Sequence, residues 1–329
     1  MRIAIFTDSF WPQINGVTTS ILNTVSELSG KGHEFLILAP KPKKFPGLEP
    51  RLKNTRIIWL PAEPLPTYTD YLMAYLIPPS AKKTFKEFNA DLVHVHTPFF
   101  VAQKGIKYGK REKIPVIGTF HTLVSEFLEY IPIPKLKHDP IMKQLTWVYT
   151  QHIYKKCDVI TTPTKVLADE LHEHGFKNVK VLTNAIDYEQ FSKGKNAKWG
   201  KKINLVYFGR VSFEKRIDIA LEALFLLQKK YSNMEMNIIG SGPAEESLKR
   251  QARELGMEKN VHFLGPKRGK ELAHAVKQNH ILVAPSPMET QGLYVLEAMA
   301  AGLCVVGADA RAIPVALGKN ERGLLFETN

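Results

Sequence analysis

Residues 285–306 read PSPMETQGLYVLEAMAAGLCVV and combine a polar loop, an apolar helix pattern and a strand-like end. The helix pattern begins at Gly292 and is nearly all apolar, so we expect a largely buried helix. It contains one acid, Glu297, and a second acid, Glu289, lies in the loop before it. An ionised acid in a buried helix is costly to desolvate unless it is hydrogen-bonded, and vicinal sugar hydroxyls are good partners.

The start of this helix is also suited to an anion. The first backbone N–H groups of a helix have no partner within it, and the positive end of its dipole lies there. A phosphate group is one ligand that such an end binds. Spacing alone leaves a plainer interpretation open, in which Glu289 is a solvated loop acid and Glu297 pairs with a structural arginine or a backbone N–H.

Apolar runs alternate with helix-like stretches along the whole chain. In the first half the runs lie at 2–7, 34–39, 56–60, 91–96, 115–120 and 157–162. In the second half INLVYFG, MNIIG, VHFLG and ILVAP alternate with helix patterns at 213–229, 244–255 and 268–278. This alternation is typical of parallel sheets covered on both faces. We predict two doubly wound α/β domains, residues 1–192 and 193–329, with the Lys-rich FSKGKNAKWGKK as the linker.

Length and cysteine content fit this interpretation. A chain of 329 residues is long enough for two domains that each bury a core. Cys157 and Cys304 are the only cysteines, which gives no disulfide framework and fits a reducing compartment. The initial MRIAIF resembles a first strand, not a signal peptide, and no apolar run approaches the roughly 18 residues that cross a bilayer. We expect a cytoplasmic protein.

Positive charge is concentrated in the first half. The formal net charge is +13, and residues 1–157 carry 21 Lys and Arg against 12 Asp and Glu, whereas residues 158–329 carry 24 against 20. A basic surface attracts nucleic acid or an anionic membrane, and a solvated lysine-rich surface is the plainer alternative. Because no helix-turn-helix, zinc-finger or RNA-recognition signature occurs, we predict no nucleic-acid partner.

The loops after the strands are where a doubly wound domain binds ligands. The loop after the first strand reaches Gly16, and a glycine there lets a phosphate approach the backbone. GRVSFEKR follows INLVYFG and places Arg210 and Lys215, whose charge-assisted bonds suit a diphosphate. Gly240 and Gly242 form only G-x-G, so a dinucleotide site is poorly supported and a tight turn is the plainer interpretation.

Histidines give one further candidate. His94 and His96 alternate on a strand, where a histidine is more often packed or hydrogen-bonded than a metal ligand. His121 follows the strand at 115–120, where a ligand would lie, and is a candidate functional residue. H-E-x-x-H, C-x-x-C and D-x-D are absent, so no metal site is predicted.

Taken together and in order, NGV, TFHT, GRVSFEKRID, IIGSGP and ETQGLYVLEAMAAG resemble the motifs of the GT-B retaining glycosyltransferases of family 4. The resemblance covers essentially the whole chain, and it is strongest to bacterial diacylglycerol glucosyltransferases and glycolipid mannosyltransferases. It implies two Rossmann-like domains that face each other across a cleft. The first would bind the acceptor and the second a nucleotide-sugar donor, with no other cofactor.

The resemblance also implies residue roles. Glu289 would bind hydroxyls of the donor sugar, and Glu297 would bind the ribose. Arg210 and Lys215 would neutralise the diphosphate, and His121 would lie near the sugar and the acceptor. The implied catalytic residues are His121, Glu289, Arg210 and Lys215; the implied donor-binding residues are Gly16, Arg210, Lys215, Gly240, Gly265, Lys267, Glu289, Gly292, Leu293 and Glu297.

The chain departs from the family pattern in places. Thr183 and Ala185 replace the usual Pro and Gly of P-N-G-V-D, which affects a turn more than the chemistry. Family members also continue past LLFETN into a helix that returns to the first domain. We therefore expect the second domain to be an incomplete, truncated one.

The acceptor is predicted from residues 65–79, LPTYTDYLMAYLIPP, which precede Lys82, Lys83 and Lys86. Aromatic and aliphatic side chains beside a basic cluster suit an anionic bilayer surface, and an ordinary core helix is the alternative. The expected activity is metal-independent transfer of a hexose from a UDP- or GDP-sugar to a membrane lipid such as diacylglycerol, at the inner face of the membrane. A soluble sugar acceptor, or epimerisation or hydrolysis of the nucleotide sugar, is the alternative.

Overall fold

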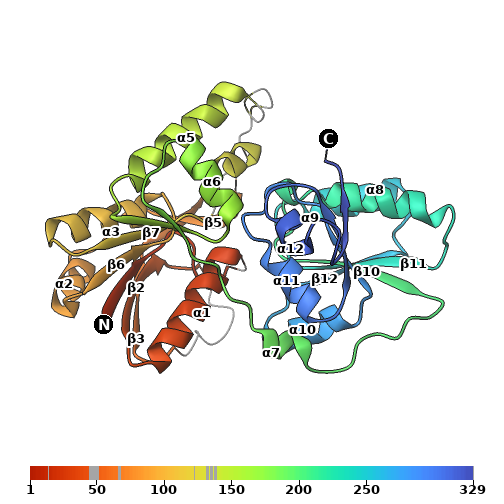
Figure 1. The fold of residues 1–329 in the computed structure, drawn as a ribbon, viewed down its shortest axis with the longest axis horizontal. Coiled ribbons are helices and arrows are strands. Elements are labelled where there is room, and N and C mark those ends of the chain that lie inside the picture. The colour runs from red at the N-terminus through yellow and green to blue at the C-terminus, as the bar shows by residue number, and fades with distance from the viewer. Residues whose placement is uncertain are drawn as a thin grey trace. The chain divides into compact units, whose positions relative to one another are not determined.

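The computed structural model describes residues 1–13, 15–43, 52–65, 68–121, 123–130, 133, 136 and 139–328. The chain divides into two compact units, Met1–Asn184 and Ala185–Asn329. Each unit has its own parallel sheet with helices on both faces (Figure 1). The predicted doubly wound α/β class is confirmed. Among the described residues, none of the helices combines the length and the apolar character needed to cross a bilayer.

The first unit is built on a parallel sheet in the order β3-β2-β1-β6-β7-β8-β9. These strands are β1 (Arg2–Phe6), β2 (Glu34–Pro40), β3 (Thr55–Leu60), β6 (Leu92–Val95), β7 (Val116–Thr119), β8 (Val159–Thr162) and β9 (Val179–Val181). An antiparallel pair is added by β4 (Ala62–Leu65) and β5 (Tyr68–Ala74). The helices are α1 (Gly16–Gly30), α2 (Pro79–Phe88), α3 (Phe100–Arg111), the 3-10 helix η1 (Val124–Tyr130), α5 (Pro140–Tyr154) and α6 (Lys165–Glu173).

The second unit repeats the arrangement with the sheet order β12-β11-β10-β13-β14-β15. Its strands are β10 (Ile203–Phe208), β11 (Met234–Ile239), β12 (Val261–Gly265), β13 (Ile281–Ala284), β14 (Cys304–Ala308) and β15 (Leu324–Phe326). Its helices are α7 (Tyr188–Ser192), the 3-10 helix η2 (Phe213–Lys215), α8 (Ile217–Gln228), α9 (Glu245–Glu254), α10 (Gly269–Lys277), α11 (Leu293–Ala300) and α12 (Ile313–Leu317).

Burial along the strands shows why the sheets are parallel and covered. Successive residues of β10 enter two different apolar clusters, Leu205 and Tyr207 in one, Val206 and Phe208 in the other. Because side chains alternate across a strand, these clusters lie on opposite faces of the sheet. A strand that is apolar on both faces has to be buried by helices on both sides.

The strand order reverses at one point in each sheet. In the first unit the reversal lies between β1 and β6, and in the second between β10 and β13. The loops that follow the two strands of each pair diverge to opposite faces of the sheet, which opens a crevice at its carboxyl edge. The loops after β1, β6, β10 and β13 are therefore the best-placed segments for a ligand.

The predicted linker is wrong. Phe191, in α7, is buried in the core of the second unit, and the division between the units falls ahead of it, at Asn184. Beyond α7, the Lys277 side chain, only 4% exposed, donates to the carbonyl of Ser192 and to Asn196 Oδ1. His280 Nε2 lies 3.2 Å from the Lys198 carbonyl. These contacts fasten the Lys-rich segment to the second unit, so it is part of that unit.

Two predicted helices differ from the structure. The alternative of a core helix at 65–79 is wrong, since β5 is a strand; residues 66 and 67 lie outside the described residues. The helix expected at 213–229 is interrupted at Arg216, whose left-handed backbone (φ 51°) separates η2 from α8. This break leaves Lys215 on a short turn of its own beside the end of β10.

Candidate functional site

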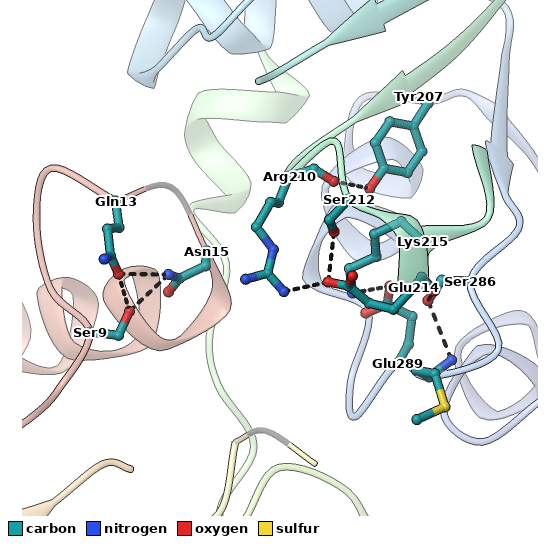
Figure 2. Close-up of polar contacts among 11 residues, drawn as sticks. Ser9, Gln13, Asn15, Tyr207, Arg210, Ser212, Glu214, Lys215, Ser286 and Glu289 are labelled. Carbon is teal, nitrogen blue, oxygen red and sulfur yellow. Dashed lines mark hydrogen bonds and ion pairs between the residues drawn. The ribbon is translucent and has the colours of Figure 1, made fainter. Parts of the chain in front are cut away.

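The loops after β10 and β13 carry the predicted charged site residues Arg210, Lys215 and Glu289. Arg210 follows β10, Lys215 ends η2, and Glu289 follows β13. Figure 2 shows these three side chains gathered in one cluster with Glu214. The sequence-predicted residues Arg210, Lys215 and Glu289 therefore lie together, at the reversal point of the sheet.

Lys215 and Glu289 form a mostly buried ion pair. Lys215 Nζ donates to Glu289 Oε1 at 2.8 Å, and Glu289 is only 7% exposed. Glu289 is not the solvated loop acid of the plainer interpretation. Burial, followed by the Glu289 carboxylate, holds the pKa values of Tyr207 and Tyr294 well above their usual range. The phenols beside this carboxylate stay neutral hydrogen-bonding groups.

Arg210 belongs to a second ion pair, with Glu214. Arg210 Nη2 donates to Glu214 Oε1 at 2.5 Å, and Ser212 Oγ donates to the same oxygen at 2.6 Å. The Tyr207 hydroxyl donates to the Arg210 carbonyl, and Ser286 Oγ donates to the Glu214 carbonyl at 3.4 Å. Sequence reasoning missed Glu214, although its place four residues after Arg210 was a usable signal.

Glu297 has a different environment. It lies in α11 and is partly buried, and its side chain has no hydrogen bond or ion pair to another described residue, so pairing with a structural arginine is wrong. Burial raises the pKa of the Glu297 carboxyl to about 8. A carboxyl group in this state gains from any hydroxyl donor that approaches it.

The remaining predicted residues of the second unit lie at other strand ends and at the start of α11. Gly292 precedes α11 with φ 73° and, as a glycine, has no side chain with which to cap the helix. Added Cβ atoms on Gly240 and Gly242 would collide with the backbone of Gly209 and Val211, so these glycines serve close packing of two loops. Gly265 ends β12, and Lys267 pairs with Glu271.

In the first unit, the loop after β1 is held by amide and hydroxyl groups. Asn15 Oδ1 accepts from the Thr18 N–H at 2.9 Å and so caps α1, in front of Gly16. The Asn15 amide donates to Ser9 Oγ, and Ser9 Oγ donates to Gln13 Oε1 at 2.6 Å (Figure 2). The predicted phosphate-approach position, Gly16, is thus the first residue of α1, directly after its capping residue Asn15.

Asp8 is a buried acid that sequence reasoning also missed. It accepts from Thr97 Oγ1 and from the backbone N–H of Val101, both at 2.7 Å. Burial raises the pKa of the Asp8 carboxyl to about 6, although these bonds act in the opposite direction. Asp8 therefore connects the loops after β1 and β6 with the start of α3 and stabilises the fold there.

Three histidines lie next to one another at the ends of β6 and β7. His96 Nδ1 is 3.0 Å from His121 Nε2, and the rings of His94 and His96 are 4.0 Å apart. His94 Nε2 lies 2.6 Å from Thr119 Oγ1. Burial lowers the pKa of His94 to about 4 and that of His121 to about 3, and burial together with the two neighbouring rings lowers the pKa of His96 well below its usual range. The cluster is neutral near pH 7, as expected of packed histidines.

Among the described residues, no group of three or more His, Cys, Asp or Glu side chains is placed to share one metal ion.

The family comparisons cover both units. The family model described as Glycosyltransferase Family 4 matches residues 14–190, and that described as Glycosyl transferases group 1 matches residues 189–329.

Individual proteins agree with these families. The chain is 30% identical over 320 residues to an alpha-monoglucosyldiacylglycerol synthase of Streptococcus pneumoniae, covering 93% of this chain and 70% of that protein. It is 26% identical to a GDP-mannose-dependent alpha-mannosyltransferase of Corynebacterium glutamicum, over 99% of this chain and 77% of that protein. The solved structure of Anabaena HepE in complex with UDP-glucose superposes with a TM-score of 0.75 at 17% identity, over 100% of this chain and 86% of that chain.

Proposed function

Since the chain belongs to the family 4 glycosyltransferases and has their GT-B class of two Rossmann-like domains, we propose that it is a retaining hexosyltransferase. The donor is a UDP- or GDP-hexose, and the acceptor is a membrane lipid such as diacylglycerol. The observation that carries the proposal is the pair of buried cation–carboxylate contacts, Lys215 with Glu289 and Arg210 with Glu214, at the reversal point of the second sheet.

The leaving nucleoside diphosphate defines the role of the cations. Negative charge grows on the diphosphate as the bond to the sugar breaks, and preorganised positive groups lower the energy of that state. Arg210 and Lys215 supply two such groups, and the uncapped start of α11 adds backbone N–H donors. With this much positive charge from the protein, we propose that transfer requires no metal ion.

Glu289 then binds the sugar. In the structure its carboxylate is held by Lys215, and a bound donor offers Lys215 a diphosphate in exchange. Glu289 is released to accept hydrogen bonds from sugar hydroxyls. After this exchange Lys215 is paired with the diphosphate and Glu289 is hydrogen-bonded to hydroxyls, which matters because a buried charge without such partners is costly.

Glu297 binds the ribose of the nucleotide. Its carboxyl is partly buried, has no bond to another described residue, and has a pKa raised to about 8. Two adjacent hydroxyls satisfy a carboxylate with good geometry, because each of its oxygens accepts one bond. The carboxylate is stabilised by the ligand instead of by the protein.

His121 and the first unit serve the acceptor side. His121 is 8% exposed and its ring is neutral, so it can form hydrogen bonds without bringing a charge. An uncharged group suits the hydroxyls of a sugar or of a lipid acceptor and does not compete with Arg210 and Lys215 for the diphosphate.

The lipid acceptor is supported by an exposed apolar surface in the first unit. Met73 near the end of β5, and Tyr75 and Leu76 directly after it, are exposed, close in sequence to Lys82 and Lys83 of α2. One side of α5 adds a stripe at helical spacing: Ile141, Leu145, Val148 and Tyr149 are also exposed. Apolar side chains combined with lysines suit peripheral binding to an anionic bilayer.

A transfer assay with defined vesicles tests the proposal. The protein is incubated with labelled UDP-glucose or GDP-mannose and with anionic vesicles that contain or lack diacylglycerol. We expect label in the lipid fraction with one of the two donors, and only when diacylglycerol is present. Release of free hexose or formation of an epimerised nucleotide sugar, independent of the lipid, would contradict transfer to a lipid.

A further inference from the structure

Glu214 is the buried acid of the donor site that the proposed roles leave unexplained. It is 4% exposed, and both Arg210 Nη2 and Ser212 Oγ donate to its Oε1. A carboxylate beside a diphosphate would repel it, so its presence there needs a compensating function.

The two ion pairs of the site differ in construction. Lys215 and Glu289 come from loops 74 residues apart, and their side chains are 16% and 9% exposed. Arg210 and Glu214 lie four residues apart in one loop, and the Glu214 side chain is 2% exposed. The Arg210 side chain is 23% exposed, so the cation of the second pair is accessible to a ligand while its acid is enclosed.

The surroundings of Glu214 fix it in place. It lies on η2, between the extended Ser212 and Arg216, whose left-handed backbone ends the turn. Ser212 holds the carboxylate, and Ser286, from the loop after β13, donates to the Glu214 carbonyl. Because Glu214 is held by both loops of the reversal point, the position of a group that is hydrogen-bonded to its carboxylate is fixed as well.

We propose that Glu214 is a positioning residue that holds the Arg210 guanidinium in the orientation in which it receives the donor diphosphate. This inference rests on the proposed function. A free arginine side chain has large rotamer freedom, and fixing it beforehand removes that cost from binding and from the transition state. Pre-orientation of Arg210 thus outweighs the repulsion between the Glu214 carboxylate and the diphosphate.

The test combines binding and kinetics. Glu214→Gln keeps the size of the side chain and removes its charge, and Ser212→Ala removes only the hydroxyl that fixes the carboxylate. Glu222→Gln, an exposed glutamate on α8, is the matched control. UDP and GDP are the calorimetric probes. We expect Glu214→Gln to weaken binding of the preferred diphosphate about tenfold, Ser212→Ala to weaken it less, and the control to bind as the unaltered chain does.

A double-variant cycle shows whether Glu214 acts through Arg210. If it does, Glu214→Gln has no further effect on binding or on kcat/KM once Arg210→Ala is present. Independent, multiplying effects would overturn the inference, as would unchanged or tighter diphosphate binding by Glu214→Gln. If Glu214→Gln does not fold, the same cycle is run with Ser212→Ala in its place. Ser212→Ala should then have no further effect once Arg210→Ala is present. Failure of the unaltered chain to bind either diphosphate would overturn the proposed function as well.

Discussion

The carboxyl edges of the two sheets have the same topology and opposite chemistry. In the second unit the reversal point is lined by ion pairs, Arg210 with Glu214 and Lys215 with Glu289. In the first unit the same edge carries neutral histidines and hydroxyls, represented by His121, and its one acid named above, Asp8, is enclosed by its own hydrogen bonds. Strand order alone therefore does not decide what each edge binds.

The difference indicates a division of labour. The cationic side chains at the second edge suit a diphosphate, and the uncharged histidines and hydroxyls at the first edge suit hydroxyl groups. The following predictions test this division, from the largest expected effect to the smallest.

The largest effect is expected at the cations. Arg210→Ala and Lys215→Ala should each lower kcat by about 100-fold to 1000-fold, because each removes one preorganised group that stabilises the leaving diphosphate. Steady-state kinetics with the preferred donor measure this. Lys259→Ala, at an exposed position of the same unit, should keep normal rates. Near-normal turnover of a folded Arg210→Ala or Lys215→Ala variant would remove that residue from the mechanism.

Glu297 should have the next largest effect, on binding. Glu297→Gln should weaken nucleoside diphosphate binding about 10-fold to 100-fold at pH 9, as expected for loss of hydrogen bonds to a charged group. Because the pKa of this carboxyl is raised to about 8, affinity of the unaltered chain should rise between pH 7 and pH 9. Calorimetry at pH 7 and pH 9 measures this change in affinity. An equal rise in affinity for the Glu297→Gln variant would mean that the change comes from ionisation of the nucleotide and not of Glu297.

His121 should affect transfer and leave diphosphate binding alone. His121→Asn should lower the transfer rate by up to about tenfold, the size of one neutral hydrogen bond, with unchanged affinity for UDP and GDP. Parallel kinetics and calorimetry separate the two. Loss of diphosphate affinity in this variant would mean that the neutral edge also holds the phosphates, against the division proposed here.

A fall in pH below 6.5 should destabilise the first unit, and a rise in pH from 4.5 to about 8 should destabilise the second. The folded pKa values of His94 and His121 lie below the usual 6.5, so the unfolded chain binds protons first as the pH falls below 6.5. The free energy of unfolding then falls by up to about 1.4 kcal/mol per pH unit for each histidine, down to about pH 4. Asp8, with its folded pKa raised to about 6, opposes part of this loss.

The contribution of Glu297 to the pH dependence of stability has the opposite sign. Its folded pKa is raised from 4.5 to about 8, so the free energy of unfolding falls as the pH rises through this range. Calorimetric unfolding at pH 5, 6.5 and 8 measures both trends. Asp8→Asn should steepen the loss of unfolding free energy below pH 6.5. Glu297→Gln should remove the loss that occurs as the pH rises from 4.5 to about 8. An acid trend of the opposite sign would mean that the histidines are already charged in the folded protein.

Much of the fold could be predicted from the sequence. The alternating apolar runs located both sheets, because parallel strands buried on two faces leave unbroken apolar segments. The exceptions depend on tertiary contacts. The Lys-rich segment resembled a linker, yet buried Lys277 fastens it to the second unit, and the φ of 51° at Arg216 is unusual for a residue other than glycine.

The charged residues of the site were predictable as single residues but not as pairs. The motifs identified Arg210, Lys215 and Glu289, whereas the partner of each became clear only once the chain had folded. Glu214 and Asp8 were missed because short motifs with an acid after a strand are common. Their function depends on the donors that the fold brings to them.

The central claim is that the second unit binds an activated sugar through Arg210, Lys215, Glu289 and Glu297. A thermal-shift panel of UDP-, GDP- and ADP-sugars tests it most directly. We predict that one base is preferred and that its sugar, at 100 times its dissociation constant, stabilises the protein by about 2.7 kcal/mol, an effect that Lys215→Ala reduces. No stabilisation by any of the three, or equal stabilisation of the Lys215→Ala variant, would contradict the claim.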